Sequence, residues 1–178
     1  MVTPGDRDRW IAMDDTRLLA ACRVDAYRAS GPGGQKRNKT SSAVRLRHEP
    51  SGLIVIAEES RSQHENKRRA LRRLRLELAL AIREPLDPAW TPPPAYRTHR
   101  TASGRIEIAR RNPDYPLVVA VVLDAVVACE GELRRAAAML DLSTAQLSRF
   151  LTGDGKLLAT VNRLRHQAGL RPIAPARQ

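Results

Sequence analysis

Residues 31–35 read Gly-Pro-Gly-Gly-Gln, and three of the next four residues are cations. Glycine leaves the backbone uncovered, and a loop with three glycines loses much conformational freedom when it is ordered. Uncovered N–H groups stabilise a developing oxyanion without any titratable side chain, while Gln35 can position or exclude a small nucleophile. The cations can neutralise phosphates. This combination favours a catalytic loop that enters an RNA-lined pocket, and the alternative is a glycine-rich strand connector with a basic edge.

Other kinds of site do not fit these residues. A phosphate-binding loop ends in Gly-Lys followed by Ser or Thr, and a dinucleotide-binding loop has a different glycine spacing. The four histidines and two cysteines are scattered along the chain without the spacing of metal ligands. We therefore expect no metal and no other cofactor.

The charge of the chain favours a polyanionic partner. Its 31 Lys and Arg residues against 19 Asp and Glu give a net charge of +12, and the excess is +8 up to Arg83 and +4 after it. Such a field attracts nucleic acid or an anionic membrane face. The most apolar run, at 117–129, is too short to span a membrane, and the N-terminus has no apolar core typical of a signal peptide. We expect a cytoplasmic protein without a membrane partner.

A proline-rich stretch divides the chain. Five prolines at 83–98 disfavour helix and strand, so we predict a linker at 84–100 between a domain at 14–83 and a module at 101–178. In the first domain, Asp14 or Asp15 is the predicted cap of a short helix that runs through Ala21, and residues 22–29 alternate like a strand. Residues 43–59 predict a hairpin with its turn at 49–52, and 64–82 predict a helix. The predicted fold class is α+β: a small antiparallel sheet with one packed helix.

The second module is predicted to be all helical. We expect helices at 114–129 and 157–168, with two shorter helices around a turn at 142–143. The spacing of Ala136, Leu140, Leu147 and Phe150 is that of a helix-turn-helix, with Asp141 where such motifs usually have glycine. The alternative is a plain three- or four-helix bundle with coincident apolar spacing.

The glycine-rich loop and a second motif carry a family resemblance. Ser-Gly-Pro-Gly-Gly-Gln at 30–35, with Asn-Lys-Thr at 38–40 and Arg-Ser-Gln-His-Glu-Asn-Lys at 61–67, resembles the catalytic domain of class I peptide chain release factors. The match runs from about 22 to 83 and keeps the order and spacing of loop, hairpin and helix. The resemblance implies a peptidyl-tRNA hydrolase of translation termination, which cleaves the peptidyl-tRNA ester in the peptidyl transferase centre of the ribosome.

The resemblance also implies roles for single residues. Gly33 and Gly34 stand where only glycine lets the loop fit, and Gln35 acts chiefly through its backbone N–H while its side chain selects water. In the family this glutamine is methylated on its amide nitrogen, so a glutamine methyltransferase is an expected partner. Lys36 and Arg37 depart from the family, which usually has His or Asn followed by Val.

The charge and the resemblance together predict two sets of RNA contacts. The main set is Lys36, Arg37, Asn38, Lys39, Arg61, Gln63, His64, Arg68, Arg69, Arg72 and Arg73. Asn66 also matches the family motif, where the role is mainly structural. The secondary set, in the helical module, is Gln146, Arg149, Lys156, Arg163 and Arg165. The expected partners are large-subunit rRNA and peptidyl-tRNA, with the chain acting as a monomer.

Two functions remain open on this sequence. About twenty residues precede the first predicted strand, where ordinary release factors have a codon-reading domain, so the chain resembles the short, codon-independent ribosome-rescue factors. Those factors end in a basic tail, whereas this chain continues into predicted helices. The alternative is a non-catalytic nucleic-acid-binding protein or regulator that uses the helix-turn-helix. Gln35 discriminates between the two, because such a binder does not need a Gly-Gly-Gln tip.

Overall fold

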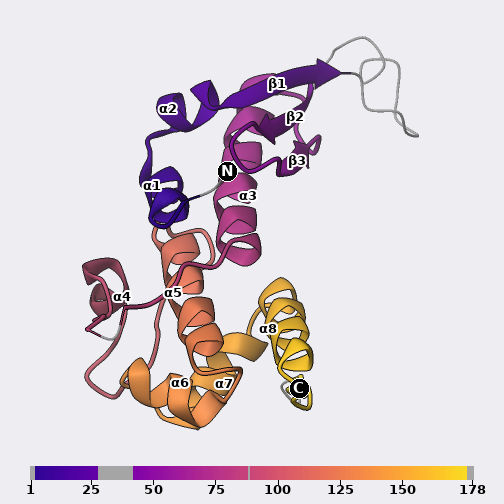
Figure 1. The fold of residues 1–178 in the computed structure, drawn as a ribbon. Helices are drawn as coiled ribbons and strands as arrows, with labels where there is room; N and C mark the ends of the chain where they lie inside the picture. Colours follow the sequence, from indigo (N-terminus) through magenta and orange to yellow (C-terminus); the bar gives the residue numbers. More distant parts are fainter. Residues whose placement is uncertain (1–2, 28–41, 88, 176–178) are drawn as a thin grey trace. The chain divides into compact units, whose positions relative to one another are not determined.

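The computed structural model of the 178-residue chain describes residues 3–27, 42–87 and 89–175 (Figure 1). The chain divides into two compact units, Met1–Leu78 and Ala79–Gln178. The first contains a three-stranded antiparallel sheet with packed helices, and the second contains helices. The predicted α+β class is therefore confirmed. No helix within the described ranges is long and apolar enough to cross a membrane.

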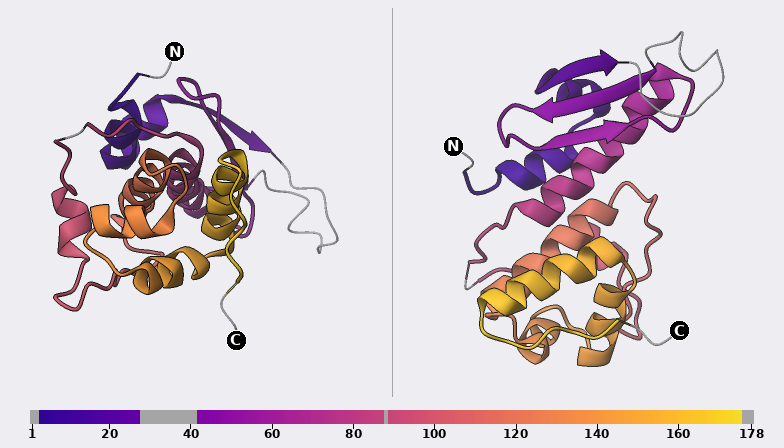
Figure 2. Two further views of the ribbon diagram at one scale, coloured as in Figure 1. Left: turned by 60° about the horizontal axis from the view of Figure 1, so that its bottom comes forward. Right: turned by 90° about the vertical axis from the view of Figure 1, so that its right-hand side faces the viewer.

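The sheet of the first unit has the strand order β1–β2–β3. Strands β1 (Cys22–Tyr27), β2 (Ala43–His48) and β3 (Ile54–Ala57) pair antiparallel, and helix α3 (Gln63–Ala81) lies along one face of the sheet (Figure 2). Alternate strand residues such as Leu46 and Val55 are buried, as are Leu71 and Leu74 of α3. Apolar residues recur at every second position of the strands and about every 3.6 residues along α3, so the apolar faces of sheet and helix meet in one core.

The predicted β2–β3 hairpin is present. Gly52 has φ +71°, and its N–H donates to the carbonyl of His48 at 2.8 Å. A residue with a Cβ is strained at this φ, which explains the glycine in the turn. The helix predicted at 64–82 is present with each end one residue earlier.

Two short helices precede the sheet. Helix α1 (Asp6–Ala12) buries Trp10 and Ile11, and α2 (Asp15–Ala20) is capped by the Asp14 carboxylate, which accepts from the N–H of Arg17 at 2.8 Å. The sequence predicted a short helix here with Asp14 or Asp15 as its cap, and the structure shows Asp14 in that place; α1 was not predicted. Four of the seven α1 residues are charged, so its apolar periodicity is too short to recognise.

The second unit is built around α5 (Tyr115–Ala128), which contacts α4 (Pro94–Thr98), α6 (Leu133–Met139) and α8 (Gly155–Gln167) (Figure 1). Helix α7 (Thr144–Thr152) contacts α6 and α8. The short α4 was not predicted within the proline-rich stretch. It forms because Pro94 stands in the first turn, where the missing N–H has no helical partner to lose.

Helix α5 is nearly all apolar but carries one buried acid. Asp124 is 2% exposed, and it accepts hydrogen bonds from the Arg83 guanidinium at 3.1 Å and the Glu84 N–H at 3.2 Å. A buried carboxylate is tolerated when it is paired in this way. The pair ties the residues that follow α3 to the central helix of the second unit.

Helices α6 and α7 are joined by a turn at 140–143, where the sequence predicts one. Asp141 has φ +54°, a left-handed backbone that glycine adopts freely and aspartate tolerates better than most residues. The Ser143 hydroxyl accepts from the Gln146 N–H at 3.2 Å, and the Gln146 side chain accepts from the Ser143 N–H at 2.8 Å. This reciprocal capping box starts α7.

Candidate functional site

The β1–β2 pairing sets where the glycine-rich loop begins and ends. The register runs from Cys22↔His48 to Tyr27↔Ala43, so the last pair joins the two residues beside the connection at 28–42. Both ends of this connection therefore leave the same end of the sheet. Gly33, Gly34 and Gln35, together with Lys36, Arg37, Asn38 and Lys39, lie outside the described residues.

Asn66 holds one end of this connection. Its side chain is fully buried in the first turn of α3. The amide donates to the carbonyls of Ser42 at 2.7 Å and Ser60 at 2.8 Å, and its oxygen accepts from the Ser60 N–H at 2.9 Å. One side chain thus joins the residue before β2, the β3–α3 loop and α3. Its role in this structure is structural, as the family motif implies.

An ion pair lies on the paired strands close to the loop. The Arg45 guanidinium on β2 donates to the Asp25 carboxylate on β1 at 2.9 and 3.1 Å, between residues that are direct cross-strand partners. This hydrogen bond holds the pKa of Asp25 below its usual range. Cross-strand pairs of opposite charge stabilise the register of an antiparallel pair.

The arginines predicted on α3 divide into two groups. Arg69 pairs with Glu65 and, at 4.0 Å, with Glu59, while Arg73 donates to Glu59 and to the carbonyl of Ile56. Arg68 and Arg72 are exposed, and the side chain of neither makes a hydrogen bond or ion pair with another described residue. Arg69 and Arg73 therefore fasten α3 to β3 and its following loop, whereas Arg68 and Arg72 are available to an external partner.

The start of α3 presents polar side chains to solvent. Arg61, Gln63 and His64 are all exposed. The Ser60 hydroxyl and then the Arg69 guanidinium hold the pKa of the Glu65 carboxyl below its usual range. This first turn is therefore ordered by its own short-range hydrogen bonds while three of the predicted RNA contacts remain accessible.

Arg75 has a structural role that the sequence did not single out. Its guanidinium donates to the carbonyls of Ile11 at 3.1 Å and Met13 at 2.7 Å, and lies 2.8 Å from the Asp15 carboxylate. It satisfies carbonyls at the end of α1 that have no helical partner. No sequence pattern separated it from the neighbouring arginines, because its partners lie about sixty residues away in the chain.

The secondary set is similarly divided. Gln146 is engaged in the capping box and donates to the carbonyl of Ser103 at 2.6 Å, and Arg165 donates to the carbonyls of Gly131 and Arg171. Arg149, Lys156 and Arg163 are exposed. Of the two α7 members of the set, Gln146 is therefore engaged within the fold and Arg149 has its side chain at the surface.

The described residues hold no cluster of three or more His, Cys, Asp and Glu side chains able to bind a metal. The buried His48 is the histidine most removed from solvent in the described part of the first unit, and its Nδ1 lies 2.8 Å from the Ser51 hydroxyl. Its ring packs edge-on against Trp10 with centroids 4.7 Å apart, so it belongs to the core.

Comparison with known proteins covers the sheet, the loop and α3. A family model described as the RF-1 domain matches residues 18–107. Proteins named peptide chain release factor 1 are similar: that of Solidesulfovibrio magneticus is 53% identical over 68 residues, 38% of this chain and 18% of the relative. Those of Ehrlichia canis and Syntrophobacter fumaroxidans are 57% and 59% identical over 56 residues, 32% of this chain and 16% of each relative. The chain spans less than a fifth of the length of these relatives.

Proposed function

The chain belongs to the class I peptide chain release factor family, and from this premise we propose that it hydrolyses the peptidyl-tRNA ester on the ribosome. The proposed catalytic residues are Gly33, Gly34 and Gln35. The Gln35 N–H stabilises the oxyanion of the transition state and its side chain selects water as the nucleophile. Preorganised backbone donors of this kind supply a large part of the catalysis in acyl transfer.

One observation carries the proposal: the catalytic residues lie in a connection whose two ends are fixed. The closing pair Tyr27↔Ala43 and the buried Asn66 amide on Ser42 hold those ends at the sheet and at α3. A loop that must enter a narrow RNA-lined site benefits from rigid ends, because a misplacement of about 1 Å can cost a hundredfold in rate.

Docking on rRNA is proposed to use the free cations of the first unit. Arg68 and Arg72 are exposed on α3, and their side chains make no hydrogen bond or ion pair within the described residues; Arg61, Gln63 and His64 are exposed at the start of the helix. Together with the loop cations at 36–39 they give this unit the charge to displace counterions from phosphates. Arg69 and Arg73 contribute to the same field while holding α3 in place.

We propose further that the reaction does not depend on the codon in the decoding site. The proposed substrate is the stalled ribosome, as the resemblance to the short ribosome-rescue factors implies. We also propose that the chain acts as a monomer and that Gln35 is methylated by a glutamine methyltransferase, which mass spectrometry of the natural protein will test.

The test is peptide release from purified ribosome–nascent-chain complexes. The natural chain and Gln35→Ala are compared on complexes with an empty decoding site, a sense codon and a stop codon. Release by the natural chain on the empty site, with no gain from a stop codon, is the expected result. Release that requires the stop codon would refute codon independence, and equal release by Gln35→Ala would refute the catalytic assignment.

A second candidate is a nucleic-acid binder without catalysis, which the α6–α7 turn at Asp141 favours. Such a protein would bind nucleic acid through the predicted helix-turn-helix. Its binding of nucleic acid would not change in Gln35→Ala, so the same variant separates the two functions.

A further inference from the structure

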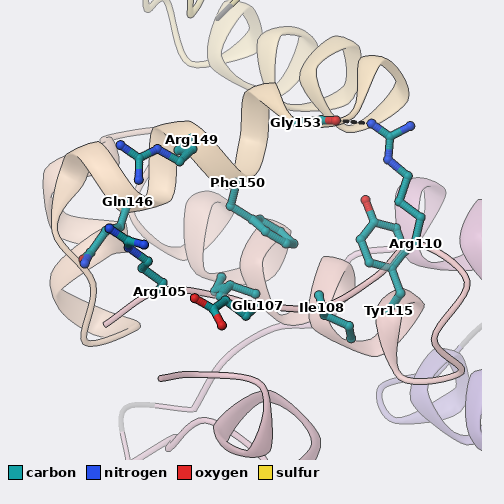
Figure 3. A pocket seen from close by; sticks show the side chains of 10 residues that line it. Arg105, Glu107, Ile108, Arg110, Tyr115, Gln146, Arg149, Phe150 and Gly153 are labelled. Carbon is teal, nitrogen blue, oxygen red and sulfur yellow. Dashed lines mark hydrogen bonds between the residues drawn. The ribbon is translucent and has the colours of Figure 1, made fainter. Parts of the chain in front are cut away.

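The second unit contains a cavity of about 310 Å³ between α7 and the segment at 105–110 (Figure 3). Figure 3 shows the Phe150 ring directed from α7 toward that segment, with the guanidinium groups of Arg105 and Arg149 at one end and Tyr115 at the other. The volume is at the lower end of the range of small-ligand sites. It suits a group the size of one nucleobase.

The charged groups around this cavity differ in how they are held. Arg110 is fastened to the wall, since it donates to the carbonyl of Gly153 and lies 3.3 Å from the Asp154 carboxylate. Arg105 and Arg149 are exposed, and the guanidinium group of neither makes a hydrogen bond or ion pair with another residue in the described part of the chain. Two cations therefore remain for an anion at the mouth of the cavity.

The lining of the cavity offers an aromatic surface and one acid. Phe150 is half-buried, and its centroid lies 6.4 Å from that of Tyr115 at an interplanar angle of 54°, so one aromatic ring supports the other. Glu107 also lines the cavity and is exposed. Aromatic rings stack on bases, and a carboxylate accepts hydrogen bonds from the exocyclic amine of a base.

The same geometry disfavours reading of duplex DNA by α7. A recognition helix needs its outward face free to enter the major groove. Here Gln146 is held by Ser143 and by the carbonyl of Ser103, and a Cβ added at Gly104 would lie 3.1 Å from the Gln146 amide oxygen. The segment that begins at Ser103 therefore runs against the face that would enter the groove.

We propose that this cavity binds an unstacked nucleotide of single-stranded RNA. The base stacks on Phe150, Glu107 accepts from its exocyclic amine, and Arg105 and Arg149 hold the adjacent phosphates. The choice of RNA rests on the proposed function, whereas the stacking, acceptor and phosphate contacts rest on the cavity alone. The second unit thereby acquires a ligand class of its own, separate from the catalytic loop.

The test measures binding of a fluorescein-labelled single-stranded RNA to the full chain by anisotropy. Phe150→Leu should weaken binding about fivefold or more, and Phe150→Tyr, which restores the ring, should bind as the natural chain does. The double variant Arg105→Ala/Arg149→Ala should lower the log–log salt slope by about 0.7 for each phosphate that is no longer neutralised. Arg134→Ala, an exposed arginine of α6 outside the cavity, is the matched control for removal of a positive charge.

Cross-linking keeps the test independent of binding elsewhere on this basic chain. RNA that contains 4-thiouridine should cross-link, on irradiation, to peptides from 105–115 and 144–153, and these cross-links should disappear in Phe150→Leu. Normal binding and cross-linking by that variant, cross-links only to other segments, or tighter binding of duplex DNA would each overturn the proposal. If Phe150→Leu has a lower melting temperature than the natural chain, the surface variant Arg105→Ala/Arg149→Ala tests the proposal instead, by RNA binding and by cross-linking.

The outcome is separable from that of the proposed function. Gln35→Ala should bind and cross-link the RNA as the natural chain does. Loss of RNA binding in Phe150→Leu without any peptide release by the natural chain would remove the proposed function and keep the cavity. Peptide release by the natural chain, together with normal RNA binding by Phe150→Leu, would keep the proposed function and remove the cavity proposal.

Discussion

At the scale of a single residue, Asn66 connects the fold to the proposed chemistry. Its buried amide satisfies two carbonyls and one N–H drawn from Ser42 and Ser60. A buried polar group left without a partner costs the free energy of its desolvation. The side chain therefore stabilises the first unit and fixes one end of the connection that carries the proposed catalytic residues.

Asn66→Ala should lower the free energy of unfolding by about 1–3 kcal/mol, because it removes the side-chain partner of three backbone groups. Peptide release should fall by more than the decrease in folded protein explains, since Ser42 loses its anchor. Urea unfolding and single-turnover release measure the two effects. The matched control is Gln63→Ala, at an exposed position three residues earlier, which should not change stability; an unchanged Asn66→Ala would show that Ser42 is held by other interactions.

His48 should make stability depend on pH. Burial lowers its pKa from the usual 6.5, although the nearby Glu49 acts in the opposite direction. Below about pH 6.5 the unfolded chain therefore takes up a proton at this histidine that the folded chain does not. The contribution of His48 to the free energy of unfolding is complete above that pH, and it is lost as the pH falls toward the pKa of the folded state. The free energy of unfolding should decrease between pH 7 and pH 5.

His48→Asn is the comparison that isolates this effect. It should be less stable at pH 7 but should lose less stability on acidification than the natural chain. The carboxyls with lowered pKa, such as Asp25 and Glu65, titrate below this window and do not confuse the difference. If the free energy of unfolding depends on pH equally in the two proteins, His48 is not the source of the pH dependence.

At the scale of an element, the arginines of α3 divide into those that stabilise the fold and those that are exposed to a partner. Arg75 serves the backbone of α1, whereas Arg68 and Arg72 face solvent. Arg68→Ala/Arg72→Ala should weaken ribosome binding and flatten its log–log salt dependence by about one unit for each phosphate contact, with unchanged melting. Ribosome binding is measured by sedimentation across a salt series. If the double variant binds as the natural chain does at every salt concentration, these arginines form only a solvated face.

The control for that experiment is Arg75→Ala. It removes the same charge from the same helix but also two hydrogen bonds to carbonyls, so it should cost about 1.5–3 kcal/mol of stability and leave the salt slope nearly unchanged.

The α6–α7 turn gives a second test at this scale. Asp141 holds a left-handed φ of +54° while its carbonyl accepts from Arg100 at 2.6 and 2.9 Å. Asp141→Val should destabilise the second unit by about 1–2 kcal/mol because a β-branched residue is strained there, and Asp141→Gly should be more stable than Asp141→Val. Urea unfolding checks this order; a valine variant as stable as the glycine variant would show that the turn relaxes.

Particular residues show what the sequence could predict. Local patterns sufficed for β1, the β2–β3 turn at Gly52, α3 and the capped helix α2, since each depends on neighbours in the chain. Periodicity did not predict α1 or α4, which are too short. It also did not separate Arg68 from Arg69 or find the partners of Asn66 and Arg75, because their contacts depend on how distant segments pack.

At the scale of the whole molecule, the positive net charge favours a polyanionic partner. The net charge of +12 is unevenly shared, with an excess of eight up to Arg83 and of four after it. Electrostatic steering by such a field speeds association with a polyanion and weakens as salt screens it. The first unit is proposed to bring the chemistry and the second a separate nucleotide contact, and both belong to one chain.

The most direct measurement of the central claim is single-turnover peptide release by Gly34→Ala beside the natural chain on stalled ribosome–nascent-chain complexes. The family assigns Gly34 to a place where only glycine fits, so an added Cβ should abolish release. Ribosome binding and the melting temperature should stay close to those of the natural chain, since the docking cations and the core are untouched. Release by Gly34→Ala at the natural rate would contradict the assignment of catalysis to this loop.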